Sequence, residues 1–350
     1  MEQYKVIKKI GSGSFSDVYL VLENSYLYAV KVFCKHTEYN IKNGFDNDVS
    51  KDYKFYETER RILERINKMR NCLNPRGYIS TNQLINYRKK DSLHFTKRHN
   101  LPCILFDYYN SNLFELVSVL GFRFSNENFR RFARDFILVI YNLEKRGIYH
   151  CDIKPKNVLL SLDENNTFKY VLSDFTNSVL LPGDANKKNE YLTTLEYRSP
   201  ERWNFSDFSE KSEVYSLGCV LYYILSNGKT LFEYENEEKM EWNDLNKKLK
   251  YETRKTVRKS LSKKYEKRIK ELQLKKRDNV KYKLESLNNV DKNIIDLLKN
   301  MLKYNNKERY SISQCLEHPY FSVKKCVKRL RLKNKFESNK KMRYPNLQIG

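Results

Sequence analysis

The segment from His150 to Asn157 carries three side chains that together could transfer a phosphoryl group. Asp152 can accept the proton of an attacking hydroxyl, and Lys154, two positions on, can neutralise a moving phosphate. Asn157 supplies a carboxamide that can hold a magnesium ion. The same spacing can arise by chance in a polar turn, so its surroundings decide how it is interpreted.

Two apolar runs follow this segment and give it a structural context. Val158–Leu160 and Val171–Phe175 are typical of strands, and the second run carries a further carboxylate, Asp174. A strand, a loop and an acidic strand end in this order favour a phosphoryl-transfer site over a chance match.

The bulk composition predicts two domains or lobes with a hydrophobic core. The 350 residues exceed the roughly 100–200 residues of one typical domain. The longest apolar run, Cys219–Leu225, is far shorter than the ~20 residues needed to span a bilayer, and the N-terminus has no apolar signal segment. Seven scattered cysteines without a CxxC pair are typical of reduced thiols. We therefore expect a monomer in the nucleus or cytoplasm, with no membrane association.

The formal net charge of +24 has two interpretations, and both stay open. A basic insertion at residues 233–288 and a basic tail at residues 322–350 could bind an acidic partner or nucleic acid. The alternative is a compositional bias without function, because the chain is rich in Lys, Asn, Tyr and Ile together.

The first third of the chain alternates in the manner of strands. Tyr4–Ile10 and Tyr19–Leu22 predict a hairpin, and Leu27–Phe33 predicts a third strand beside it. The hairpin turn carries Gly11 and Gly13, whose missing Cβ atoms would let backbone N–H groups approach a phosphate closely. An ordinary hairpin turn is the alternative.

Lys31 lies within the third strand among apolar neighbours, so we expect it to be buried and to need an anionic partner. An amphipathic helix is predicted over residues 53–69. Glu59 on this helix is the expected partner, whereas Glu57 and Glu64 are expected to face water.

The remaining pattern is mainly helical. Ser125 is the expected cap of a helix that Gly147 closes, immediately before the segment that carries Asp152. Other expected elements are strands near Leu84–Tyr87 and Leu101–Tyr109 and helices over residues 211–227 and 291–303.

The motifs as a set resemble the eukaryotic protein kinases. Their order along the chain is Gly11–Val18, Lys31, Glu59, Asp152–Asn157, Asp174, Thr194–Glu201, Ser212–Gly218 and Arg309, the last matching the arginine that pairs with Glu201. The sequence Tyr-Arg-Ser-Pro-Glu around Arg198 resembles the CMGC group of these kinases. The surroundings of Glu59, Phe106 and His150 are most similar to its dual-specificity tyrosine-regulated (DYRK) and CLK-like branches.

This resemblance implies an α+β, bilobal protein-kinase fold over residues 4–321. The N-lobe, about residues 4–109, would hold five strands in an antiparallel sheet plus one helix. The C-lobe, about residues 110–321, would be mainly helical, with ATP bound in the cleft between the lobes.

The resemblance also implies a serine/threonine protein kinase that transfers the γ-phosphoryl group of Mg-ATP to protein hydroxyls. Asp152 and Lys154 would be catalytic, Asn157 and Asp174 would hold Mg²⁺, and Lys31, fixed by Glu59, would bind phosphates. The residues implied to surround the nucleotide are Ile10, Gly11, Gly13, Val18, Ala29, Leu105, Phe106, Asp107, Tyr109 and Leu159.

Regulation and substrate binding are implied for three further residues. Thr194 and Arg198 would shape the peptide site. Tyr191 stands where related families carry a regulatory tyrosine, so we hypothesise that it is autophosphorylated and that its phosphate pairs with Arg198. One tyrosine among 27, without a role, is the alternative.

Several residues depart from the family pattern, among them Ser16 in place of a third glycine and Glu196 in place of an uncharged residue. Cys151 replaces an arginine that holds a loop phosphate, Thr176 replaces the glycine of Asp-Phe-Gly and stiffens that segment, and Glu213 replaces a structural aspartate. Cys151, Thr176 and Glu213 keep one alternative open, a scaffold without catalysis. A nucleic-acid-binding protein on the same fold is a second alternative.

Overall fold

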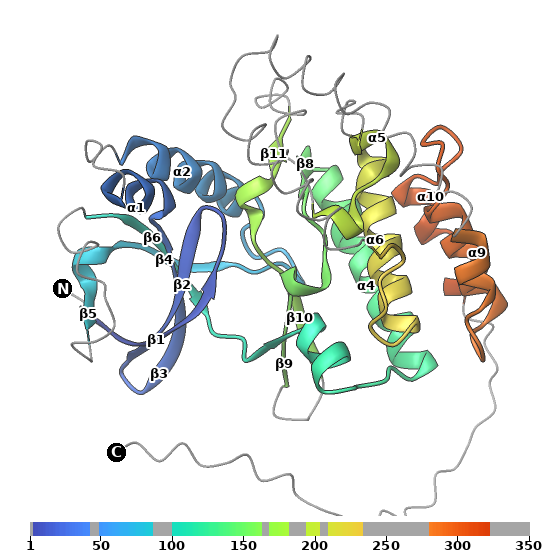
Figure 1. Cartoon of the computed structure of the whole chain (residues 1–350), viewed down its shortest axis with the longest axis horizontal. Coiled ribbons are helices and arrows are strands. Elements are labelled where there is room, and N and C mark those ends of the chain that lie inside the picture. The colour runs from blue at the N-terminus through green and yellow to red at the C-terminus, as the bar shows by residue number, and fades with distance from the viewer. Residues whose placement is uncertain are drawn as a thin grey trace, which may run out of the picture.

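Six strands of the N-lobe form one sheet in a computed structural model of the chain, in the order β4-β6-β3-β2-β1-β5 (Figure 1). Their bounds are β1 Tyr4–Ser12, β2 Ser16–Glu23, β3 Tyr26–Phe33, β4 Pro75–Ser80, β5 Leu84–Asn86 and β6 Pro102–Asp107. The structure describes residues 3–42, 49–86, 100–162, 168–181, 194–203, 209–233 and 280–322. Most of the basic insertion and all but the first residue of the basic tail therefore lie outside the described residues.

The sheet differs from the expected one in two respects. It has six strands instead of five, and the pair of β1 with β5 is parallel, whereas all other pairs are antiparallel. Leu84 of β5 is buried in one cluster with Tyr4 and Val6 of β1. Burial of this leucine holds β5 against the edge of β1.

Within the described residues of the N-lobe, two α-helices rather than one accompany the sheet: α1 (Lys35–Lys42) and α2 (Ser50–Arg65). The carboxylate of Asp52 on α2 accepts hydrogen bonds from the backbone N–H groups of His36 and Thr37, at 3.0 and 2.8 Å, and from the Thr37 hydroxyl. These N–H groups belong to the first turn of α1 and have no partner within the helix. A residue 15 positions away therefore caps α1.

The C-lobe is mainly helical, as the sequence predicts, and lies opposite the sheet with short strands between the two (Figure 1). The helices are α4 Asn126–Glu144, α5 Pro200–Trp203, α6 Glu210–Leu225, α9 Lys292–Met301 and α10 Ile312–Leu316. The strands are β7 Ser111–Asn112, β8 Ile148–Tyr149, β9 Val158–Leu162, β10 Phe168–Leu172 and β11 Val179–Leu180. Among the described residues, no helix is both long and apolar enough to cross a membrane.

The first long helix of the C-lobe begins where the sequence predicts. The Ser125 hydroxyl accepts a hydrogen bond from the N–H of Asn128, which caps α4. Its buried face carries Phe132 and Phe136, whose rings stack at 4.6 Å. Nearly every residue of α6 is buried, so α6 forms the centre of the lobe, with α4 and α9 packed against it.

A buried ion pair ties α5 to the segment before α10. Arg309 binds both carboxylate oxygens of Glu201, at 2.8 and 2.9 Å, and donates to three backbone carbonyls. Its guanidinium also lies 4.9 Å from the ring centre of Tyr215. The pair predicted from the resemblance is therefore formed, and its hydrogen bonds satisfy a buried charge.

Gly147 is a position where the backbone requires glycine, and we expect Gly147→Ala to destabilise the protein. Its φ is +70°, and an added Cβ would lie 2.7 Å from the carbonyl oxygen of Leu181. A left-handed conformation costs about 1–2 kcal/mol in a residue with a Cβ, and the clash adds to this cost. Urea unfolding measures the loss.

Gly77→Ala is the matched control, because an added Cβ at Gly77 has no atom within 4 Å. We expect its free energy of unfolding to stay within about 0.5 kcal/mol of the wild-type value. Equal stability of the two variants would contradict the argument for Gly147.

Candidate active site

Lys31 brings three distant segments together. Its ammonium on β3 donates to both carboxylate oxygens of Glu59 on α2, at 2.9 and 2.7 Å, and to Asp174, at 2.7 Å. Lys31 is 7% exposed and Glu59 is 1% exposed. Glu57 and Glu64 instead bind Arg60 on the outer face of α2, with half of each side chain exposed. The expected choice of Glu59 is therefore the one that the structure contains.

The charges of Lys31 and Asp174 stabilise each other. Burial acts to lower the pKa of Lys31, but Asp174 and Glu59 outweigh it and raise that pKa. Burial raises the pKa of Glu59, which Lys31 opposes. Burial also acts to raise the pKa of Asp174, yet Lys31 outweighs it and holds that pKa well below its ordinary value. Lys31 is therefore a cation and Asp174 an anion near neutral pH.

The loop between β8 and β9 assembles a second group around Asp152. Lys154 forms an ion pair with one oxygen of the Asp152 carboxylate and donates to the Thr194 hydroxyl at 2.9 Å. Thr194 donates to the other oxygen through its backbone N–H, at 3.1 Å, and its hydroxyl, at 2.7 Å. Thr194, expected in the peptide site, thus directly orients the carboxylate of Asp152.

Buried groups behind the loop hold its backbone. The Glu213 carboxylate on α6 accepts hydrogen bonds from the N–H groups of His150, at 2.8 Å, and Cys151, at 3.0 Å. Nδ1 of the His150 ring accepts from the N–H of Asp152, so Nε2 must carry the proton that it donates to the Ser173 carbonyl. Burial lowers the pKa of His150, which keeps the ring neutral in this arrangement.

Asn157 and Asp174 present oxygen atoms that suit a magnesium ion. The Asn157 amide nitrogen donates to the backbone carbonyl of Asp152 at 2.9 Å, so its carboxamide oxygen is available for a cation. Asp174 binds Lys31 through one oxygen, and its side chain is 41% exposed. A carboxylate and a carboxamide oxygen are ligands that Mg²⁺ prefers, so the two residues fit the group that the resemblance implies.

One face of the sheet turns toward these groups. In antiparallel pairs, opposite residues share a face, and Lys31 lies opposite Val18, whereas Ala29 lies opposite Phe106. Ala29, Lys31 and Phe106 therefore lie on one face, together with Val18. Leu105 lies on the other face, opposite Val30 and buried in the apolar cluster that includes Tyr4, Val6 and Leu84. Its expected place beside the nucleotide is wrong, because successive strand residues point to opposite faces.

The glycine-bearing turn is fixed by a residue that the sequence reasoning missed. Asp17 is 1% exposed and binds Lys9 and Lys35, each at 2.7 Å, and the Ser12 hydroxyl at 2.8 Å. Nothing in the local sequence distinguishes it from a solvated turn aspartate. Gly11 and Gly13 lie on either side of Ser12, and Ile10 before them is 38% exposed.

The expected hinge follows β6. Asp107 binds Arg76 at 2.6 Å, and the ammonium of Lys169 lies 5.7 Å from the ring centre of Tyr109. Burial raises the pKa of Tyr109 to about 12. Leu159 on β9 is partly buried against the main core.

The two residues proposed for regulation are placed only in part. Arg198 is 1% exposed, at the end of the short 3₁₀ turn Leu195–Tyr197. Tyr191 lies outside the described residues, so its hypothesis stays a prediction. Cys151 is buried with Val179 in a small apolar cluster, with Tyr149 and Leu181 packed against it.

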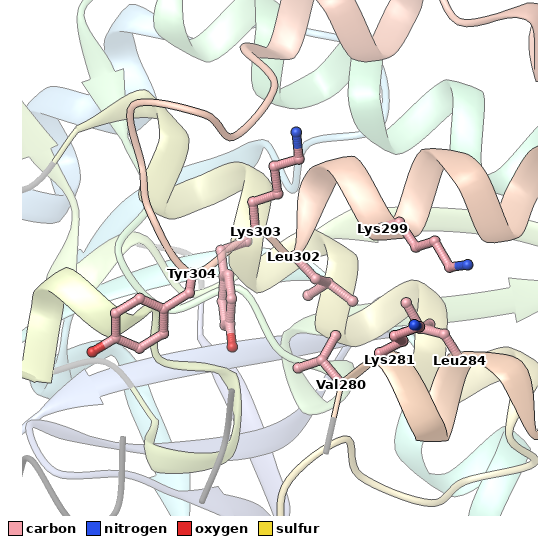
Figure 2. A pocket seen from close by; sticks show the side chains of 8 residues that line it. Val280, Lys281, Leu284, Lys299, Leu302, Lys303 and Tyr304 are labelled. Atoms are coloured by element: carbon pink, nitrogen blue, oxygen red, sulfur yellow. The ribbon is translucent and has the colours of Figure 1, made fainter. Parts of the chain in front are cut away.

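A cavity of about 310 Å³ lies elsewhere in the C-lobe. Figure 2 shows side chains that line it. Val280, Leu284 and Leu302 line it together with lysines such as Lys281 and Lys303. None of the residues around Lys31 or Asp152 lines this cavity, so it is separate from the candidate active site.

The comparisons agree with the geometry. The family model of the protein kinase domain matches residues 4–321. The chain is 28% identical over 236 residues to human dual specificity tyrosine-phosphorylation-regulated kinase 3. The aligned region covers 67% of this chain and 35% of that protein. It is equally similar to the mbk-2 kinase of Caenorhabditis elegans, with 25% of that protein covered. Human cyclin-dependent kinase-like 5 is 26% identical over 346 residues, 94% of this chain. The chain spans between about a quarter and a third of these relatives' own lengths.

The buried carboxylate behind the loop predicts a pH dependence of stability. Burial raises the pKa of Glu213 to about 7, from an ordinary value of 4.5. The folded state therefore holds this proton more tightly than the unfolded state does. The resulting stabilisation, about 3 kcal/mol, is fully present below about pH 4.5 and is lost as the pH rises through about 7. Urea unfolding between pH 4.5 and pH 8 measures it.

Glu213→Gln should lose this component, because the amide does not titrate, and its stability should depend less on pH than that of the wild type. Glu64→Gln on the outer face of α2 is the control and should keep the wild-type dependence. Parallel curves for the wild type and Glu213→Gln would contradict the assignment.

Proposed function

Because the chain belongs to the protein kinase family, we propose that it transfers the γ-phosphoryl group of ATP to serine or threonine hydroxyls of other proteins. The observation that carries the proposal is the contact of the Lys31 ammonium with both Glu59 and Asp174. A buried cation with two carboxylates is costly to maintain for stability alone. It is suited to binding phosphates and to placing a metal ligand beside them.

Asp152 would act as the base that orients the substrate hydroxyl and accepts its proton. Its carboxylate is 5% exposed and is held by Lys154, Thr194 and Asn157. A carboxylate fixed from several sides loses little freedom when the substrate binds, which favours the reactive geometry.

Lys154 would stabilise the negative charge of the phosphoryl group during its transfer, because the Lys154 ammonium lies beside the Asp152 carboxylate that orients the substrate hydroxyl. Lys31 would bind the α- and β-phosphates. Asn157 and Asp174 would hold Mg²⁺, which neutralises charge on the β- and γ-phosphates when it is bound.

The face that carries Ala29 and Phe106 would receive the adenine, with Val18 over it and Leu159 below. Asp107 to Tyr109 would supply backbone hydrogen bonds to its edge.

Asp152→Asn should abolish phosphotransfer while the fold stays intact. Loss of a general base costs about 10²–10⁴ in rate, and the amide still accepts the hydrogen bonds of Thr194. We would measure incorporation of labelled phosphate into a degenerate peptide library, and the library also gives the preferred acceptor residue. The control is Asp296→Asn, on an exposed part of α9.

Thermal shifts with Mg·ATP separate the alternatives. Asp152→Asn should keep the wild-type shift, because Asp152 does not bind nucleotide. A wild type with no shift would favour the scaffold alternative, and an Asp152→Asn protein with full activity would remove Asp152 from the proposed role.

Tyr191 is proposed to be modified by the enzyme itself. Two of the relatives are named as tyrosine-phosphorylation-regulated kinases, which supports this hypothesis. Mass spectrometry of protein from a bacterial host should detect phosphotyrosine at Tyr191 in the wild type but not in Asp152→Asn. An active wild type with unmodified Tyr191 would remove the idea.

A further inference from the structure

Thr176 contacts every member of the Lys31 cluster. Its hydroxyl is 2.6 Å from the Lys31 ammonium, 2.6 Å from the Glu59 carboxylate and 2.8 Å from the Asp174 carboxylate. The residue is 1% exposed. It stands where the family motif has glycine, which has no side chain to make these contacts.

The hydrogen atoms can be assigned to these contacts. The ammonium of Lys31 has three N–H groups, and its partners are three residues: Glu59, whose two carboxylate oxygens share one N–H group, Asp174 and Thr176. The hydroxyl accepts one N–H and has one O–H to donate, so it serves either Glu59 or Asp174 at a time. Thr176 is thus an uncharged link that completes the hydrogen bonding of Lys31 without a third carboxylate.

We infer that Thr176 is a positioning residue that holds Lys31 and Asp174 in place for ATP by bridging them to Glu59 while the site is empty. The inference rests on the proposed function, since it assumes that ATP is the ligand. When ATP binds, the Lys31 N–H group that donates to the Thr176 hydroxyl can donate to a phosphate oxygen instead. The ammonium then stays beside both carboxylates. The hydroxyl can still donate to Glu59 or Asp174, so the carboxylates keep their relative positions.

Two substitutions isolate the hydroxyl. Thr176→Val keeps the branched shape and removes the hydroxyl, whereas Thr176→Ser keeps the hydroxyl and removes the methyl group. The matched control is Thr58→Val on α2, because Thr58 is also buried and its hydroxyl donates to the uncharged backbone carbonyl of Lys54, at 2.9 Å.

Equilibrium binding of ATP and of adenosine by the full chain tests the inference, each with and without Mg²⁺. Without the hydroxyl, the side chains of Lys31 and Asp174 must be ordered when ATP binds, so the affinity of Thr176→Val for ATP should fall by about ten-fold. Its affinity for adenosine should not change, because adenosine carries no phosphate. Thr176→Ser and Thr58→Val should bind both ligands as the wild type does, and kcat/KM for ATP should follow the same order.

Three outcomes would overturn the inference. Thr176→Val could bind ATP as tightly as the wild type or more tightly, which would mean that the hydroxyl is idle or competes with the phosphates. It could lose ATP and adenosine equally, which would mean a general structural defect. The wild type could bind no ATP, and the proposed function would then fail as well. A wild type that binds ATP in the expected pattern but transfers no phosphoryl group would refute the proposed function alone.

Discussion

The arrangement of the N-lobe depends on one electrostatic requirement, the compensation of the buried ammonium of Lys31. A cation that is 7% exposed needs fixed anionic partners, and Glu59 on α2 and Asp174 after β10 both contact it. Nζ of Lys31 therefore links the position of α2 against the sheet to the position of the segment after β10. With two carboxylates and one ammonium, the cluster has a net negative charge. The Asp174 side chain is 41% exposed, so water can solvate this charge or a bound cation can neutralise it.

The loop between β8 and β9 follows a different principle, in which side chains stabilise an unusual backbone. Cys151 and Asp174 both have φ of 65°, a region that costs energy for residues with a Cβ. Glu213 binds the N–H groups of His150 and Cys151, and His150 binds the Ser173 carbonyl just before Asp174. The two strained positions are thus connected by a chain of buried hydrogen bonds, which fixes Asp152 relative to Asp174.

Two kinds of feature could be predicted from the sequence: helix ends marked by a local residue pattern, and ion pairs in which a buried charge requires an opposite charge nearby. The Ser125 cap is a local signal, and the burial of Lys31 identifies Glu59 by helix period alone. Contacts between distant segments had no such signal: β5 joins β1 through Leu84, α1 is capped by Asp52, and Thr194 reaches Asp152 from 42 positions away. Leu105 was assigned to the wrong face because its strand is apolar on both sides, so hydrophobicity could not indicate which residues face the nucleotide.

Three of the departures from the family pattern leave the contacts of the candidate site in place. Glu213 is one methylene longer than aspartate and still accepts both backbone N–H groups. Cys151 lies in an apolar cluster with Val179, so position 151 offers no cation for a phosphate on the neighbouring loop. Order around Asp174 must then come from contacts that need no phosphate, and Thr176 supplies hydrogen bonds to three charged groups at that place. The loss of a phosphate-binding arginine and the gain of a bridging hydroxyl are therefore consistent with each other.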